Sequence, residues 1–510
     1  MNKSCFKSNL WLLVTGVFGS IALTLWSLHI DPVINNDGVH YILTAEYIAS
    51  GQWHEAFQTF KWPAYSALVY LVQLVTGTEF KTSAHIVTTI GFGLLVFAFL
   101  AVTHTLGARG RVLWYALITI LIYPGINEFR SFLIRDSLYL ACYMFAIWNL
   151  LLYATTRRGL PLISALVLLL LASLFRVEAA LLVFIFPIIY IYRRVDRGRR
   201  GGVLFAYLCL ATLALGVFYG WWIYQPDGDQ SRWVILSRPF EVLSLAGSQV
   251  WIEIQKNVQF VQTNRLNDGS YILSWILMVV TVFWIVIKET AEAITAPFLI
   301  LLIYAWRHRQ VIPTQVPGVR RVFTIILSLQ LIVLLTFVSI KFFIASRYPI
   351  ALSLTLILAV PFTIEHLLHS KGKTAKVWKT FLIRSSVVLL LLVNAVEGLD
   401  SFSHKKYLQV AGIWARENIE DNARIVSNDP KFLFYANRYR DYRVLIADPG
   451  QFATWLNTNL WQWKDYVVVY LTKHDNELRE IVEKALDQEP IKIFAGDRGD
   501  ELRVYYTADD

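Results

Sequence analysis

The sequence predicts a polytopic α-helical membrane protein with a small α/β domain at its carboxyl end. Of its 510 residues, 56% are hydrophobic and only 16% are charged, and the mean hydropathy is +0.48. An ordinary soluble domain has roughly 25% charged residues. Apolar runs near the ~18–20 residues that cross about 30 Å of hydrocarbon recur from Leu10 almost to Asp400. From Ser401 onward the long runs stop and charges become frequent.

The apolar runs predict about eleven membrane spans together with helices that lie at the membrane surface. The first run lacks a small-residue cleavage site after a short apolar core, so we interpret it as an anchor rather than a removable signal. The predicted spans are 10–30, 83–103, 111–124, 136–156, 161–175, 178–193, 202–222, 271–288, 320–343, 348–368 and 380–398.

Two further apolar segments, 63–77 and 293–306, are ambiguous because both are rather short. Basic loops face the cytoplasm in membrane proteins. All basic loops fall on the same side only if neither of these two segments crosses the membrane. The net charge of +10 is explained mainly by these loops, so it does not indicate nucleic-acid binding. The basic loops are Arg109/Arg111, Arg157/Arg158, Arg193–Arg200, Arg307–Arg321 and Lys371–Lys379.

The same scheme predicts a cytoplasmic amino terminus and a multi-pass protein of the inner (plasma) membrane with an extracytoplasmic carboxyl end. The segments expected outside are Asp31–Lys81, Gly125–Asp136, Arg176–Glu178, Tyr224–Ser270, Ala345–Tyr348 and everything after Asp400.

We divide the chain into a membrane domain, 1–400, and an extracytoplasmic α/β domain, 401–510. In the second part short strand-like stretches such as YVVVYLT alternate with helix-like ones such as NELREIVEKAL. It contains no glycine-rich phosphate loop. Cys5, Cys142 and Cys209 lie in or beside predicted spans without metal-ligand spacing, so they predict neither disulfides nor a metal site.

The first loop, NNDGVHYILTAEYIASG, combines an acid, a turn glycine and a helix with apolar residues at helical spacing. Such a helix is suited to the membrane interface. Asp37 stands just before it and could be a simple N-cap, because acids are favoured there. It could equally be a functional carboxylate, and the two roles are compatible.

Other predicted outer corners also carry ionisable groups, which are costly at the membrane edge unless they are paired or used. Purely structural roles would also explain these residues: Asp136 could cap a helix or pair with Arg135, and Arg347 could anchor the helix by reaching lipid headgroups. Together, however, they supply acids and arginine forks, and a fork suits bidentate binding of phosphate. These corner residues are Arg130, Arg135, Asp136, Arg176, Glu178, Lys341, Arg347 and Tyr348.

This mixture fits transfer of a sugar carried on a lipid phosphate. That chemistry needs cations for the departing phosphate, a carboxylate for the proton of the acceptor hydroxyl, and a membrane-level cleft for the lipid. No nucleotide site is required, in agreement with the missing glycine-rich loop. No cofactor is predicted with certainty, although Asp37, Asp136 and Glu178 could support a divalent cation.

At the level of motifs the sequence resembles the GT-C superfamily of polyprenyl-phosphate-sugar-dependent membrane glycosyltransferases, which includes protein O-mannosyltransferases and bacterial aminoarabinose transferases. The resemblance spans most of residues 10–370. It rests on the order of five elements: NNDGVHYILTAEYIASG, KWPAYSALVYLVQLVTG, FRSFLIRDSLY, LFRVEAALL and SRYPIALSL. The carboxyl-terminal domain also suits bacterial members.

The resemblance implies Asp37 as general base, Asp136 as a second catalytic acid, and Arg347–Tyr348 as contacts of the lipid phosphate. It makes 63–77 a second interfacial helix. The implied partners are a polyprenyl-phosphate sugar, a glycan, lipid or protein acceptor, and membrane lipids. Glycine follows Asp37 where many relatives have a second acid, so no subfamily is assigned.

Three rival functions are compatible with a polytopic chain. A transporter of a lipid-linked or anionic substrate would also place charges among helices, but repeated halves and charges near the midplane are typical of transporters. A scaffold that displays the soluble domain would not need charges on separate corners. Phosphoethanolamine or acyl transfer would need a nucleophile motif or a metal cluster, and neither is recognisable.

Overall fold

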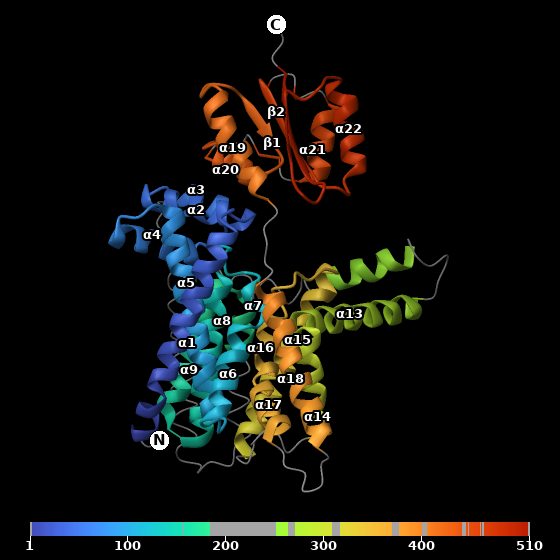
Figure 1. The fold of residues 1–510 in the computed structure, drawn as a ribbon. Helices are drawn as coiled ribbons and strands as arrows, with labels where there is room; N and C mark the ends of the chain where they lie inside the picture. The colour runs from blue at the N-terminus through green and yellow to red at the C-terminus, as the bar shows by residue number, and fades with distance from the viewer. Residues whose placement is uncertain are drawn as a thin grey trace, which may run out of the picture. The chain divides into compact units, whose positions relative to one another are not determined.

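A computed structural model shows a helical trunk and a small mixed sheet, as the sequence predicts (Figure 1). The contacts group the chain into two compact units, each assembled from separate stretches. The first comprises Met1–Leu25, Ile86–Arg130 and Arg135–Asp400, and the second comprises Trp26–His85, Ser131–Ile134 and Ser401–Asp510. The structure describes residues 3–156, 158–183, 251–263, 271–308, 317–369, 377–399, 405–440, 445–446, 448–458, 461 and 464–507.

Within these ranges seven helical segments are long and apolar enough to cross a membrane. The sixth is interrupted after Ile357, just before Pro361, because proline cannot supply a backbone N–H to a continuous helix. The helices that contain the seven segments are α1 (Lys3–Ile30), α5 (Phe80–Thr105), α8 (Asp136–Thr156), α13 (Tyr271–Ile294), α15 (Pro317–Lys341), α16 (Ile350–Ile357) with α17 (Val360–His369), and α18 (Val377–Leu399).

Four shorter apolar helices accompany them: α4 (Ala64–Thr76), α6 (Arg111–Leu121), α9 (Gly159–Phe175) and α14 (Ala296–Arg307). The ambiguous segments 63–77 and 293–306 thus form helices of 13 and 12 residues, about 20 Å and 18 Å long at 1.5 Å per residue. Both fall short of the roughly 30 Å of a hydrocarbon core, and so does α6 in the predicted span 111–124, which has 11 residues. The predicted span 202–222 and most of 178–193 lie outside the described residues.

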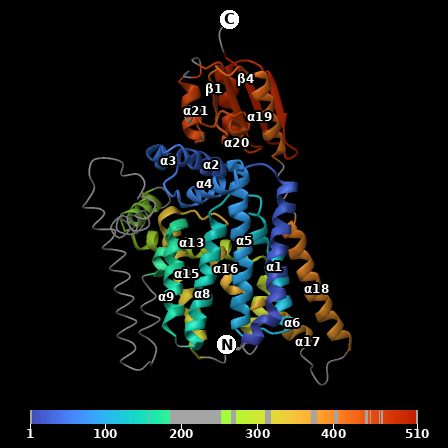
Figure 2. The same cartoon turned by 90° about the vertical axis from the view of Figure 1, so that its left-hand side faces the viewer.

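In the first unit α8 and α9 pack side by side (Figure 2). Their contact is apolar, and Leu150 and Leu169 are among its buried residues. Gly91 of α5 lets α5 approach the first turn of α8 closely: a Cβ there would lie 2.6 Å from Ser137 Oγ. The start of α8, and with it Asp136, is therefore positioned by close packing.

In the second unit α2 (Asn36–Ala49) packs against α3 (Trp53–Thr59) and α4. The predicted helix of the first loop is confirmed, but it is buried on more than one side, with Tyr41 and Leu43 both enclosed. Gly38 is not a turn residue as the sequence analysis expected. It lies in the first helical turn, where a Cβ would meet Asn35 Oδ1 at 2.8 Å and Leu133 Cβ at 3.1 Å.

The described carboxyl-terminal residues form a four-stranded mixed sheet in the order β1-β2-β4-β3. Strands β1 and β2 run parallel, and β4 pairs antiparallel with β2 and β3. A further strand-like stretch of the sequence, YRVLIAD at 442–448, lies partly outside the described residues, and Leu445 within it forms a parallel bridge to Ser427. The strands are β1 (Ile425–Ser427), β2 (Tyr466–Leu471), β3 (Lys492–Ala495) and β4 (Glu501–Tyr506).

Helices cover both faces of this sheet (Figure 1). Alternation along β2 explains why: Val468 faces one hydrophobic cluster, whereas Val467 and Val469 face the other. The first cluster is covered by α19 (Lys406–Asn418) and α20 (Pro430–Tyr435). The second is covered by α21 (Pro449–Asn457) and by α22 (Asn476–Leu486), which matches the predicted helix NELREIVEKAL.

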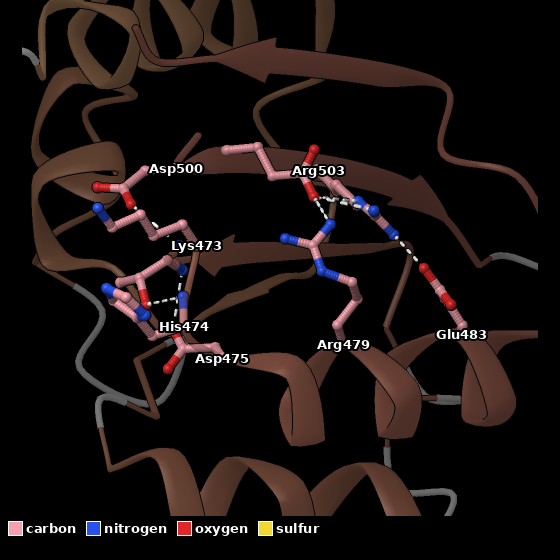
Figure 3. Close-up of polar contacts among 9 residues, drawn as sticks. Lys473, His474, Asp475, Arg479, Glu483, Asp500 and Arg503 are labelled. Atoms are coloured by element: carbon pink, nitrogen blue, oxygen red, sulfur yellow. Dashed lines mark hydrogen bonds and ion pairs between the residues drawn. The ribbon is translucent and has the colours of Figure 1, made fainter. Parts of the chain in front are cut away.

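An ion-pair network ties α22 to β4 (Figure 3). Arg503 Nη1 donates to Glu483 Oε1 at 2.9 Å, and Arg503 and Arg479 both contact Glu501. At the other end of the same region Lys473 N donates to Asp500 Oδ1 at 3.1 Å. These contacts link elements of the α/β domain to one another, and we assign them a structural role.

Candidate functional site

The structure brings three of the predicted corners together in the first unit. Asp136 is the first residue of α8, Arg176 ends α9 in an extended conformation, and Tyr348 lies in the turn before α16. Arg176 is the centre of the group, because Asp136, Glu178 and Tyr348 all contact it. We refer to these four residues as the Arg176 cluster.

The Arg176 guanidinium is held on every side. Its Nε and Nη2 donate to Glu178 Oε2 and Oε1 at 3.3 and 2.9 Å, and its Nη1 donates to Asp136 Oδ1. The centre of the guanidinium lies 4.2 Å from the ring of Tyr348 and 5.6 Å from that of Tyr139. The side chains of Arg176 and Asp136 are each only 5% exposed. A charge buried to this extent is retained only when it is paired and hydrogen-bonded.

Two further predicted arginines act on the same cluster. Arg135 and Arg347 both contribute to the electrostatic field at Asp136, and Arg135 also acts on Glu178. With Arg176 they make three cations against two carboxylates, which leaves one positive charge in excess. Arg135 and Arg347 are both partly exposed. The group therefore has the charge and the arginine forks that favour an anion such as a phosphate.

Two other predicted binding residues are placed differently. Arg130 is 1% exposed, and its guanidinium donates to Asn127 Oδ1 at 2.7 Å and to Ser20 and Thr24 of α1. These contacts connect the loop before α8 to α1. Lys341 ends α15 and is exposed. Within the described residues, neither is among the contacts of the Arg176 cluster.

Asp37 belongs to the second unit and lies in the first turn of α2. The interpretation of Asp37 as N-cap was wrong, because the N-cap position is Asn35. The Asn35 side chain does not cap the helix; it pairs with the main chain of Leu133, accepting at 2.8 Å and donating at 3.2 Å. Asp37 therefore lies in the first turn of the helix, where the helix dipole favours an acid.

Sequence reasoning missed several contacts in the second unit. Tyr435 OH donates to Pro32 O at 3.1 Å and accepts from Ile34 N at 3.0 Å, and Lys81 Nζ donates to Pro32 O at 3.1 Å. Burial raises the pKa of Tyr435 to about 12. These pairs are separated by up to 403 residues, so no local pattern could have revealed them.

Tyr139 was also missed. It lies one turn after Asp136 on α8, where residues three apart share a helix face, so this spacing could have indicated it. For a metal, the described residues contain no group of three or more His, Cys, Asp or Glu side chains that could hold an ion.

The fold is GT-C-like, similar to the solved structures of an archaeal oligosaccharyltransferase and of ArnT. Archaeal oligosaccharyltransferase AglB from Archaeoglobus fulgidus, solved with an inhibitory peptide and a dolichol-phosphate, superimposes with a TM-score of 0.55. Its sequence identity is 13%, and the match covers 98% of this chain and 74% of AglB.

ArnT from Cupriavidus metallidurans in the apo state matches with a TM-score of 0.50 and 13% identity, over 99% of both chains. The apo oligosaccharyltransferase of Archaeoglobus fulgidus matches with a TM-score of 0.52 and 12% identity, over 91% of this chain and 70% of the other. No protein-family model and no curated protein sequence matches this chain. At such identities the likeness establishes the fold.

Proposed function

We propose that the protein is a glycosyltransferase that moves a sugar from a polyprenyl-phosphate donor to a hydroxyl acceptor. The acceptor is a cell-envelope glycan, lipid or protein. The GT-C-like fold supports this proposal, as does the dolichol-phosphate held by AglB, a protein of the same fold. The proposal places the reaction and the carboxyl-terminal domain on the outer face of the plasma membrane.

The observation that carries the proposal is the Arg176 cluster together with Arg135 and Arg347, three cations that face two carboxylates. A donor phosphate becomes more negative as its bond to the sugar breaks, and arginines fixed in advance stabilise that charge without reorganising. Asp136 and Glu178 hold the Arg176 fork in one orientation. We assign contact with the phosphate to Arg347 and Arg135, which are less buried than Arg176.

The chemical step is a single displacement with inversion. The Asp37 carboxylate takes the proton of the acceptor hydroxyl, and the acceptor oxygen forms a bond to the anomeric carbon of the sugar. The bond from that carbon to the phosphate oxygen breaks, and its electron pair leaves with the polyprenyl phosphate. A positioned general base contributes typically about 10²–10⁴-fold to such a reaction. The role of Asp136 as a second catalytic acid stays a prediction.

The test is to analyse the envelope glycans and lipids of a strain that lacks the gene. We expect one sugar to be missing from an envelope product and its polyprenyl-phosphate carrier to accumulate. Complementation with wild type should reverse both changes, whereas the Asp37→Asn variant should reverse neither. A complete set of envelope sugars, accompanied by loss of uptake or export of an anionic substrate, would instead support a transporter.

A further inference from the structure

A pocket of about 430 Å³ lies within the second unit, and none of its lining residues belongs to the Arg176 cluster. Its size is in the range of small-molecule sites, roughly 300–1,000 Å³. One wall comes from α2 and α3, and the other comes from α20 and the residues that follow it. The lining residues are Val39, His40, Leu43, Tyr47, Glu55, Gln58, Thr59, Pro430, Leu433, Tyr439 and Leu445.

The chemistry of the lining favours an uncharged, hydroxyl-rich ligand. Part of the lining is apolar. The imidazole of His40, the carboxylate of Glu55, the amide of Gln58 and the hydroxyl of Thr59 provide hydrogen-bond donors and acceptors. Neither lysine nor arginine is present among the described lining residues, so an anion would lack a counter-charge. Burial lowers the pKa of His40, which keeps its imidazole neutral at pH 7.

The wall from the α/β domain is fixed before any ligand binds. Tyr439 OH donates to Glu46 Oε1 at 2.6 Å, and its ring lies 4.9 Å from that of Phe434. Arg440 Nε donates to the other Glu46 oxygen at 3.0 Å. On the opposite wall Gln58 Nε2 and His54 Nε2 are 2.8 Å apart. A pocket with pre-positioned side chains loses little conformational entropy on binding.

The secondary structure of the walls argues against a peptide as the ligand. Extended peptides are commonly recognised through main-chain pairing with an open strand edge. Here α2, α3 and α20 form most of the lining, and a helix uses its main-chain groups internally. Recognition must therefore come from side chains, as in sites for small molecules.

We propose that this pocket binds a neutral sugar ring of the acceptor. This inference rests on the proposed function and narrows its acceptor to a glycan or glycolipid. His40 lines the pocket and lies three residues after Asp37 on α2, where residues share a helix face, and the charge of Asp37 acts on His40. An acceptor hydroxyl beside His40 is thus one helical turn from the proposed base.

Saturation-transfer NMR on the purified full-length protein in detergent tests the inference. The probes are methyl glycosides of glucose, mannose and N-acetylglucosamine, with a serine-containing peptide and inorganic phosphate for comparison. We expect transfer to the ring protons of at least one glycoside and to neither comparison probe. Gln58→Ala should weaken glycoside binding about tenfold, the loss of roughly one hydrogen bond. Thr59→Trp should abolish it by filling the pocket.

The matched control is Gln451→Ala, the same change at an exposed position of α21 outside the pocket, which should leave binding unchanged. Two results would overturn the inference: glycoside binding that survives in Thr59→Trp, or binding of the peptide and of no sugar. If the proposed function is wrong, the result differs: the protein would bind glycosides but would show no sugar transfer. If transfer occurs, Gln58→Ala should raise the acceptor KM and leave donor affinity unchanged.

Discussion

At the scale of single residues, Asp37 is the proposed base because of its position in the first turn of α2 and the sequence resemblance. Asp37→Asn retains the size of the side chain but loses its basicity. We expect turnover to fall about 10²–10⁴-fold while donor binding and folding are retained. The measurement is release of polyprenyl phosphate by the purified variant. Activity within about threefold of wild type would remove Asp37 from the proposed mechanism.

Arg347 offers a second test, because anchoring in lipid headgroups and binding of phosphate make different demands. An anchor needs only a long cation, so Arg347→Lys would be harmless. A bidentate phosphate contact needs the planar fork, so we expect losses of about tenfold for Arg347→Lys and about a hundredfold or more for Arg347→Ala. Donor-analogue affinity should be measured beside turnover.

If lysine matches wild type in both quantities, Arg347 is an anchor. The phosphate contact would then move to Arg135, the other partly exposed arginine near Asp136.

At the scale of elements, the packing of α5 against α8 determines where Asp136 stands. Gly91→Ala places a methyl group 2.6 Å from Ser137 Oγ and 3.1 Å from Leu138 N, so the first turn of α8 must shift. We expect turnover to decrease at least about tenfold, since a misplacement of about 1 Å can cost more. Activity of the purified, correctly folded variant is the measurement.

Gly93→Ala on the same helix is the matched control. Its Cβ would meet only Val17 Cγ1 at 3.5 Å, an ordinary contact, and alanine favours a helix over glycine by roughly 0.5–1 kcal/mol. This variant should be fully active and slightly more stable. Equal loss of activity in both variants would show that Gly91 has no special part in positioning Asp136.

Sequence patterns predicted the elements better than their contacts. Hydrophobic length identified α1, α5, α8, α13, α15 and α18, and alternation identified β2. The capping role of Asp37 was wrong because the helix already begins at Asn36, so that the N-cap position is Asn35, whose side chain pairs with Leu133. Residue type predicted that Arg176 and Glu178 form a charged corner, but pairing of Arg176 with Asp136 depends on tertiary packing across 40 residues.

At the scale of the whole molecule, the positive-inside rule makes a prediction about topology. In a chain whose native cysteines are replaced by serine, Gln488→Cys in the α/β domain should react with a membrane-impermeant maleimide in intact cells. Arg158→Cys, in a predicted cytoplasmic turn, should react only after lysis. Labelling of both or neither in intact cells, or the reverse pattern, would show that another apolar segment crosses. The predicted loops near Asp227, Arg199 and Lys373 lie outside the described residues.

The division into two units differs from a simple cut of the chain. The second unit combines Ser401–Asp510 with two stretches, Trp26–His85 and Ser131–Ile134, that lie between segments of the first unit in the sequence. A boundary near residue 400 stays a prediction about where the soluble domain begins. The contacts of the first loop could not be predicted from the sequence. Hydropathy indicates whether a segment lies in lipid or in water, but it does not indicate which other segment it packs against.

The hydrogen bond between Ile34 and Tyr435 has a consequence for biosynthesis, since its two ends are 401 residues apart. A ribosome adds about 5–20 residues per second, so roughly 20–80 seconds separate the appearance of the two partners. During that interval the first loop has been synthesised, but Tyr435, which contacts it in the finished protein, has not. A nascent chain arrested before Tyr435 should therefore expose the α2 region to protease, and release of the finished chain should protect it.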